Sequence, residues 1–291
     1  MPEDPQKRPL VVPLDAQKTD GIPFFMVPGL GGHVMSAQVL TRHVPDPWRG
    51  FGILYPAFSE SEPRLTSFAA MAERLVPDIL EHQANGPFLF MGYSMGGFVC
   101  VELARALRAR GHRAGIVMVD VKLVWHAPLL PVVKRLPLKA YWMLREQAVK
   151  VFDRSKTRAR ELEKRRLSRV EEQGVAGGSN PSFRRAVVDG RTALAAYELT
   201  PFNVPIALIR CAEMAWWDSL RQWPHDYGWS HYTRVLDVST SPGDHLQMIS
   251  GPRLQPLGEA MARALGLVSD AVQALPPSIR AGQPVAPVRD P

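Results

Sequence analysis

The chain has 291 residues, which is enough for one sizeable core with an insertion or for two small domains. Its content of 46% hydrophobic and 22% charged residues is ordinary for a globular protein. No apolar run approaches the roughly 18 residues of a membrane-spanning helix, so no membrane insertion is expected.

The positive charge is concentrated in one part of the chain. Residues 131–174 contain thirteen Lys/Arg and six Asp/Glu, an excess (13 − 6 = 7) equal to the net charge of +7 of the whole chain. A basic surface favours an acidic partner, and a solvated, salt-bridged helix face is the alternative. Aromatic residues are not interleaved in this run as on a base-stacking surface, so we expect no nucleic acid partner.

The N-terminal residues 1–21 are polar and proline-rich and lack the apolar stretch of a secretory signal. We interpret them as a leader or linker. The two cysteines, Cys100 and Cys211, predict buried thiols in a reducing cytoplasm rather than a disulfide framework. Neither a CxxC pair nor a His/Cys cluster occurs, so we expect no metal and no bound cofactor.

From residue 22 onward, short apolar runs alternate with helical patterns. The runs that predict buried strands are residues 24–27, 52–55, 87–91, 114–119, 205–210 and 234–238. Helices are predicted from an N-cap at Thr66 to about residue 80, over 98–110 and over 254–265. This alternation is typical of an α/β fold with a mostly parallel central sheet that helices cover on both faces.

Residues 122–203 interrupt the alternation. They begin with proline-rich turns, continue as a charged helical pattern over 138–173, and resume after a break as a second helix to about residue 197. We predict a helical insertion over the sheet edge, which would act as a lid. The proline-rich residues 268–291 are predicted to be a disordered tail, which leaves 22–267 as the main domain.

The strongest motif is GYSMG at residues 92–96, a G-x-S-x-G sequence between a predicted strand and a predicted helix. A serine on such a sharp turn projects above the sheet, and the flanking glycines leave room for the backbone to pass closely. The following helix directs its N-terminus at the site, so the N–H of Met95 can face a developing oxyanion. We therefore predict Ser94 as a nucleophile.

A nucleophilic serine needs a base within hydrogen-bond reach. Of the eight histidines, His245 follows the last predicted strand and fits the chain order serine, acid, histidine. Gly243 permits the bend that would turn its imidazole inward. His33, which follows two glycines, is the alternative base.

Two positions compete for the acid that would orient this histidine. Asp120 ends the strand that follows the serine, directly after six apolar residues. Burying a charge there is unfavourable unless the charge has a partner, which suggests a functional role for Asp120. Glu213 follows the predicted strand 205–210 and is the competing position. Asp244 adjoins His245 and is expected to point away from it. We favour Asp120.

The loop VPGLGG at residues 27–32 follows the first core strand. We predict that its Leu30 N–H pairs with the Met95 N–H as an oxyanion hole. Large aromatic side chains are candidate walls of a substrate pocket, and ordinary packing is the alternative for each. These residues are Tyr93, Trp125, Tyr141, Trp142, Trp216 and Trp217.

In combination these segments resemble the type I thioesterase domains of nonribosomal peptide and polyketide synthases, within the α/β-hydrolase superfamily. The resemblance runs from about residue 10 to residue 267 and is carried by FFMVPGLGG, GYSMGGFVCVELARAL, VMVD, GWSHYT and GDHLQM. It implies the α/β-hydrolase fold, Asp120 as the acid, and transfer of an acyl group from phosphopantetheine to Ser94, with release by hydrolysis or cyclisation. Type II members usually place histidine before the nucleophile, where this chain has Tyr93.

The resemblance also implies a donor, either an acyl or peptidyl carrier protein or coenzyme A. Carrier proteins are typically acidic, so the basic insertion would suit one, with Lys164, Arg165 and Arg166 as candidate contacts. The chain would then be a free-standing enzyme or an excised synthase domain. Two alternatives stay open, a carboxylesterase or lipase that acts on a diffusible ester and a non-catalytic module that binds acyl carriers.

Overall fold

A computed structural model of the chain describes residues 9–30, 34–55, 63–152 and 181–275. Its centre is a seven-stranded sheet in the order β1-β3-β2-β4-β5-β6-β7. The strands are β1 (Val11–Pro13), β2 (Ile22–Val27), β3 (Trp48–Ile53), β4 (Phe88–Tyr93), β5 (Ala114–Val119), β6 (Ile206–Cys211) and β7 (Val235–Ser241). Only β1 is antiparallel to its neighbour, so the predicted parallel sheet is confirmed.

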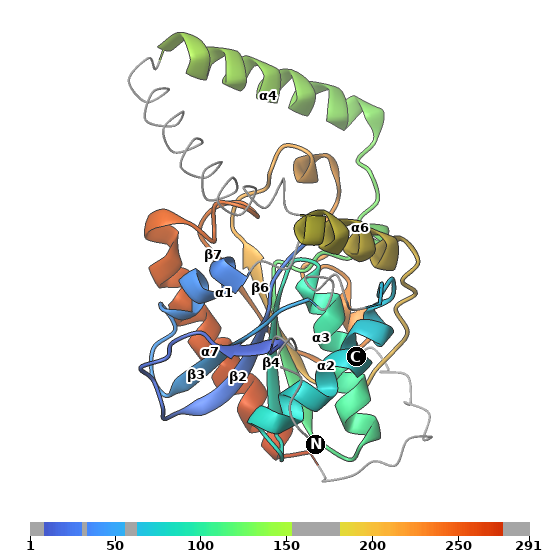
Figure 1. Ribbon diagram of the computed structural model, residues 1–291. Coiled ribbons are helices and arrows are strands. Elements are labelled where there is room, and N and C mark those ends of the chain that lie inside the picture. The colour runs from blue at the N-terminus through green and yellow to red at the C-terminus, as the bar shows by residue number, and fades with distance from the viewer. Residues whose placement is uncertain (1–8, 31–33, 56–62, 153–180, 276–291) are drawn as a thin grey trace.

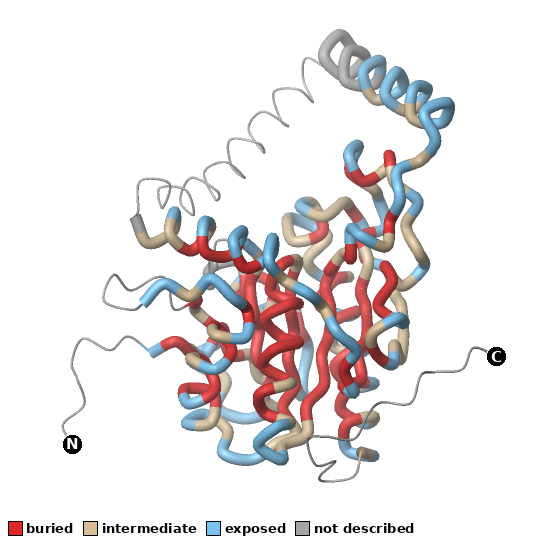
Figure 2. The backbone as a smooth tube through the Cα atoms, turned by 90° about the vertical axis from the view of Figure 1, so that its right-hand side faces the viewer, coloured by how far each residue is buried: buried red, intermediate tan, exposed pale blue. Residues whose placement is uncertain are grey.

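Helices cover both faces of the sheet (Figure 1). One face packs against α1 (Val34–Thr41) and α7 (Leu254–Gln273), and the other against α2 (Phe68–His82) and α3 (Gly96–Ala109). Because successive strand side chains point to opposite faces, Phe24 lies in the core beneath α7, whereas Phe25 lies in the core beneath α2 and α3. The central strands are buried on both faces (Figure 2), as their continuous apolar runs predict.

The start of α2 shows how local sequence sets an element boundary. The Ser67 side chain, one residue after the predicted cap Thr66, accepts a hydrogen bond from the Ala70 N–H at 3.2 Å. Serine in extended backbone before a helix satisfies one of the unpaired N–H groups of the first turn. The predicted apolar face is buried against the sheet and α3, including Met71 and Leu75.

The structure corrects both predicted ends of the main domain. Strand β1 lies inside the segment 1–21 that was predicted as a leader, with Leu10 and Leu14 buried on either side of it. Helix α7 continues to Gln273, eight residues past its predicted end and into the predicted tail. It continues because Val268 and Val272 pack on Gly115, where a Cβ would lie 2.3 and 2.5 Å from their methyl groups. Residues 276–291 lie outside the described residues.

The insertion contributes two described helices, α4 (Val132–Phe152) and α6 (Pro181–Ala195). Helix α4 extends away from the sheet (Figure 1), and its side chains over 132–144 are all exposed or half-buried. Helix α6 lies across the body above the sheet and buries Ala186, Asp189 and Ala193. The rest of the predicted charged helix, 153–173, falls outside the described residues, and a lid function stays a prediction. Within the described ranges, no helix is long and apolar enough to cross a membrane.

Candidate active site

Ser94 lies on a strained turn between β4 and α3, with a φ of 52°. Glycines make this turn possible. A Cβ on Gly92 would lie 2.5 Å from the Gly97 Cα, and a Cβ on Gly96 would lie 2.4 Å from the Pro28 carbonyl oxygen. Because no Cβ tolerates such distances from backbone atoms, the motif glycines are required for the chain to turn here.

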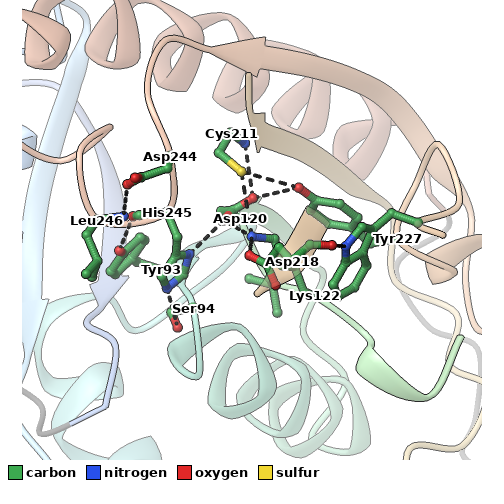
Figure 3. A network of polar contacts seen from close by, with 12 residues as sticks. Tyr93, Ser94, Asp120, Lys122, Cys211, Asp218, Tyr227, Asp244, His245 and Leu246 are labelled. Carbon is green, nitrogen blue, oxygen red and sulfur yellow. Dashed lines mark hydrogen bonds and ion pairs between the residues drawn. The ribbon is translucent and has the colours of Figure 1, made fainter. Parts of the chain in front are cut away.

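The turn brings Ser94 to a histidine and a carboxylate from distant parts of the chain. The Nε2 atom of His245, on the loop after β7, lies 3.1 Å from the Ser94 Oγ (Figure 3). Its Nδ1 atom lies 2.6 Å from the Oδ2 atom of Asp120, at the end of β5. The structure thus brings together the three residues predicted as nucleophile, base and acid. The alternative base His33 lies outside the described residues.

The Asp120 carboxylate is buried, and both of its oxygens have polar partners. Its Oδ1 accepts hydrogen bonds from the Cys211 N–H at 3.0 Å and the Tyr227 hydroxyl at 2.8 Å, while Oδ2 faces His245 and the Lys122 ammonium. Burial alone would raise the pKa of Asp120. The hydrogen bond to His245, the charge of Lys122 and the Cys211 N–H together outweigh burial and hold that pKa below its ordinary value. Asp120 therefore stays ionised.

Lys122 is a member of this network that the sequence analysis missed. Its Nζ lies 2.9 Å from the Asp120 Oδ2 and 2.7 Å from the Oδ2 of Asp218, in the short helix η4 (Asp218–Leu220). Burial works to lower the pKa of Lys122, but the two carboxylates raise it above its ordinary value. The one available sequence signal was a lysine two residues after the predicted acid.

The two other candidate acids have different environments. Glu213 follows β6 as predicted but is exposed to solvent. Asp244 uses its Oδ1 to accept the N–H groups of Leu246 at 3.0 Å and Gln247 at 2.9 Å, and so caps the turn after His245. Among the three carboxylates, Asp120 is the one placed on the imidazole.

The glycine-rich loop lies against the turn that carries Ser94. A Cβ on Gly29 would lie 3.4 Å from the Ser94 Cβ, so the backbone before Leu30 passes directly beside the serine. Across the site, Gly190 of α6 lies against both predicted oxyanion residues. A Cβ there would be 2.7 Å from the Met95 Cε and 3.2 Å from the Leu30 Cδ1. The roles of the Leu30 and Met95 N–H groups as oxyanion donors stay a prediction.

The predicted pocket residues separate into three places. Tyr93 does not line a pocket, because it is buried behind the imidazole and its hydroxyl donates to the His245 carbonyl oxygen. Trp125 is 49% exposed and donates through Nε1 to the Tyr232 hydroxyl at 3.1 Å. Trp142 of α4 donates through Nε1 to the Ser219 Oγ at 3.1 Å, beside the loop that carries the half-exposed Trp216 and Trp217. Its ring meets the ring of the exposed Tyr141 edge-on, with centroids 5.7 Å apart.

Two further predictions concern the carrier protein and a metal ion. The candidate carrier contacts Lys164, Arg165 and Arg166 lie outside the described residues. Within the described part of the chain, no group of three His, Cys, Asp or Glu side chains is placed to hold a metal ion.

Comparison with known proteins gives a family match for one segment. Residues 22–123 match the family described as thioesterase domain, a segment that contains the glycine-rich loop, Ser94 and Asp120. The indigoidine synthase of Dickeya dadantii (strain 3937) is 34% identical over 89 residues, which are 31% of this chain and 6% of that protein. The spectinabilin polyketide synthase system protein NorC of Streptomyces orinoci is 28% identical over 206 residues, 67% of this chain and 7% of that protein. The chain thus spans less than a tenth of the length of either synthase.

Solved structures extend the likeness to most of the chain. The NocB thioesterase domain from the nocardicin cluster has a TM-score of 0.61 and 22% identity, and the match covers 88% of this chain and 99% of that domain. The Vlm2 thioesterase domain has a TM-score of 0.56 and 19% identity, with 88% and 100% covered. The chain therefore has the α/β-hydrolase fold of these thioesterase domains, and its segment 22–123 carries the match to the thioesterase domain family.

Proposed function

We propose that the chain is a serine thioesterase that releases an acyl, peptidyl or polyketide chain from a phosphopantetheine thioester through an acyl-Ser94 intermediate. The observation that supports this most directly is the contact series from the Ser94 Oγ through His245 to the buried Asp120. The family match, which covers Ser94 and Asp120, points to a thioester as the bond that is cleaved.

In the first half of the reaction, the His245 Nε2 takes the Ser94 proton as the Oγ attacks the thioester carbonyl carbon. The N–H groups of Met95 and Leu30 would hold the oxyanion. When the tetrahedral intermediate collapses, the carbon–sulfur bond breaks, and the proton on His245 passes to the departing pantetheine thiolate. Asp120 stays ionised throughout and stabilises the transient imidazolium.

In the second half, the ester on Ser94 is cleaved. His245 takes a proton from water, or from a hydroxyl or amine within the acyl chain, as that group attacks the ester carbonyl. The proton then returns to the Ser94 Oγ, which regenerates the enzyme and gives a free acid or a ring. Access of water beneath α4 and α6 would decide between these outcomes.

The donor that suits the described surface is an acyl or peptidyl carrier protein, with coenzyme A as the small-molecule form of the same pantetheine group. Over positions 132–144, α4 carries Lys134, Arg135 and Lys139 and no acidic residue. An acidic carrier would be attracted to such a helix.

Both cysteines are free and buried, which supports the expected cytoplasmic location.

A fluorophosphonate probe tests the serine chemistry directly. The wild-type chain should be labelled at Ser94, and Ser94→Ala should lose both labelling and turnover, on the order of 10⁶-fold in kcat, with an unchanged circular dichroism spectrum. Turnover is measured on an acyl-pantetheine thioester and on a short nitrophenyl ester. Absence of labelling would indicate a non-catalytic carrier-binding module, and a preference for the nitrophenyl ester would indicate a carboxylesterase.

The carrier is tested by reversing charge on α4. Replacing Lys134, Arg135 and Lys139 together by Glu should raise KM for a carrier-bound substrate at least tenfold and leave turnover of the free acyl-pantetheine unchanged. The effect should shrink at high salt because exposed charges are screened. Equal turnover of both substrates by wild type and variant would exclude α4 as the carrier contact.

A further inference from the structure

One oxygen of the candidate acid serves two partners. The Asp120 Oδ2 lies 2.6 Å from the His245 Nδ1 and 2.9 Å from the Lys122 Nζ, while the other oxygen is occupied by uncharged donors. The imidazole therefore shares its carboxylate oxygen with a permanent cation. A cation at this position works against a second positive charge on the imidazole, which must appear when His245 takes the serine proton.

A second carboxylate balances that cation. Asp218 holds the Lys122 Nζ at 2.7 Å, and the lysine side chain is only 10% exposed. The ammonium also faces the rings of Trp223 and Tyr227 at 5.8 and 5.7 Å, within the range of cation–π attraction. Lys122 and Asp218 thus form a buried neutral pair that leaves the charge of Asp120 available to the imidazolium.

We propose that Lys122, held by Asp218, is a positioning residue that sets how firmly His245 binds its proton by sharing the Asp120 carboxylate. This inference rests on the proposed function for its kinetic test, because it assigns a role within that same site. Lys122 touches neither the serine nor the leaving group in this scheme and acts through Asp120.

The other titratable or charged groups around Asp120 and His245 do not neutralise the charge of Lys122. They are Tyr93, Cys211, Arg210, Tyr227, Asp244 and Arg253. Burial raises the pKa of both tyrosines, and it raises that of the Cys211 thiol to about 11, so all three are neutral. Arg210 stacks on the Tyr227 ring and donates to backbone carbonyls, Asp244 caps its own turn, and Arg253 lies against Gly243.

The test is the pH dependence of kcat/KM for an acyl-pantetheine thioester, whose acid limb reports protonation of the base in the free enzyme. Lys122→Met leaves the Asp218 charge unbalanced, so the acid limb should move up by about one pH unit. Asp218→Asn leaves the ammonium unbalanced, so the limb should move down by a similar amount. The double variant removes both charges and should return the limb toward the wild-type position.

Two controls separate charge from structural damage. Lys122→Arg keeps the cation and should keep the limb within a few tenths of a pH unit. Arg110→Met and Glu73→Gln break a surface ion pair of 2.6 Å elsewhere on the chain and should leave the limb in place. Shifts of opposite sign at two contacting residues do not follow from loosened packing, which would move both variants in the same way.

A measurement that does not require turnover tests the role of Lys122 independently of the proposed thioesterase activity. The imidazole of His245 can be titrated by NMR in each variant, whether or not the enzyme acts on thioesters. Opposite displacements for Lys122→Met and Asp218→Asn would support the proposal. The proposal would be overturned if the His245 titration were unchanged in both folded variants or were displaced in the same direction in both. If Lys122→Met does not fold, the His245 titrations of Asp218→Asn and of the double variant decide.

Discussion

The Tyr93 hydroxyl donates a hydrogen bond to the His245 carbonyl oxygen across 2.5 Å, and its ring stacks on the imidazole with centroids 5.0 Å apart and planes inclined by 16°. Because Tyr93 directly precedes Ser94, the strand that carries the serine also holds the loop that carries the histidine. Burial raises the pKa of Tyr93 well above its ordinary value, so the hydroxyl stays protonated and remains a donor.

We predict that Tyr93→Phe lowers kcat by a few-fold, roughly up to tenfold, because it removes one hydrogen bond from the histidine loop and keeps the stacked ring. Tyr93→Leu, which also removes the stack, should lower kcat further. Steady-state kinetics should show the loss in kcat with KM little changed in both variants. Wild-type kcat in Tyr93→Leu would show that Tyr93 does not position His245.

Asp120 should make the stability of the fold depend on pH. Its folded pKa lies below the ordinary 3.8, so its contacts stabilise the native state above about pH 4, and this stabilisation is lost as the pH falls through the folded value. Asp120→Asn removes that dependence and should also lower kcat about 10⁴-fold, because the imidazolium loses its counter-charge. Urea unfolding should show wild type losing more stability than the variant between pH 7 and pH 3.

A matched control for this prediction is Asp46→Asn. Asp46 pairs with Lys18 at 2.5 Å, but its side chain is 86% exposed, and exposed ion pairs contribute little. Its unfolding free energy should follow that of wild type at each pH. Equal acid sensitivity of wild type and Asp120→Asn would contradict the ionised, buried state of Asp120.

Much of the site could be predicted because each part leaves a local signal. The strand before Ser94 is a continuous apolar run, and the motif glycines report a turn whose backbone contacts exclude any Cβ. Asp120 stood out as a charge at the end of a buried strand. The same edge of a parallel sheet collects these strand ends, so topology alone placed the three residues near one another.

What the sequence did not reveal depends on partners far along the chain. Strand β1 is three residues long and exists because it pairs with β3. The residue before it, Leu10, donates its N–H to the Oδ2 of Asp78 at 3.3 Å. The buried ion pair of Lys122 with Asp218 spans 96 residues, and no periodic pattern records it. Tyr93 looked like a pocket wall because its stacking partner, His245, is 152 residues away.

The contact of Gly190, in α6, with Met95 and Leu30, the two predicted oxyanion donors, gives a further prediction. Gly190→Ala would place a Cβ 2.7 Å from the Met95 Cε and 3.0 Å from its Sδ. These atoms are the end of a flexible side chain, so the fold should persist, with the thermal midpoint within a few degrees of wild type. Met95 must move, however, and its N–H is the proposed oxyanion donor. We therefore expect kcat to fall about tenfold or more, within the range seen on weakening one such donor.

Gly266→Ala in α7 is the matched control, because a Cβ there meets no atom within 4 Å. It should raise stability by about 0.5–1 kcal/mol through the better helix propensity of alanine and leave kcat unchanged. Combining Gly190→Ala with Met95→Ala removes the crowding side chain and should recover part of the lost kcat. If Gly190→Ala instead behaves like Gly266→Ala, more stable and fully active, then α6 does not press on Met95 in solution and cannot control the space beside Ser94.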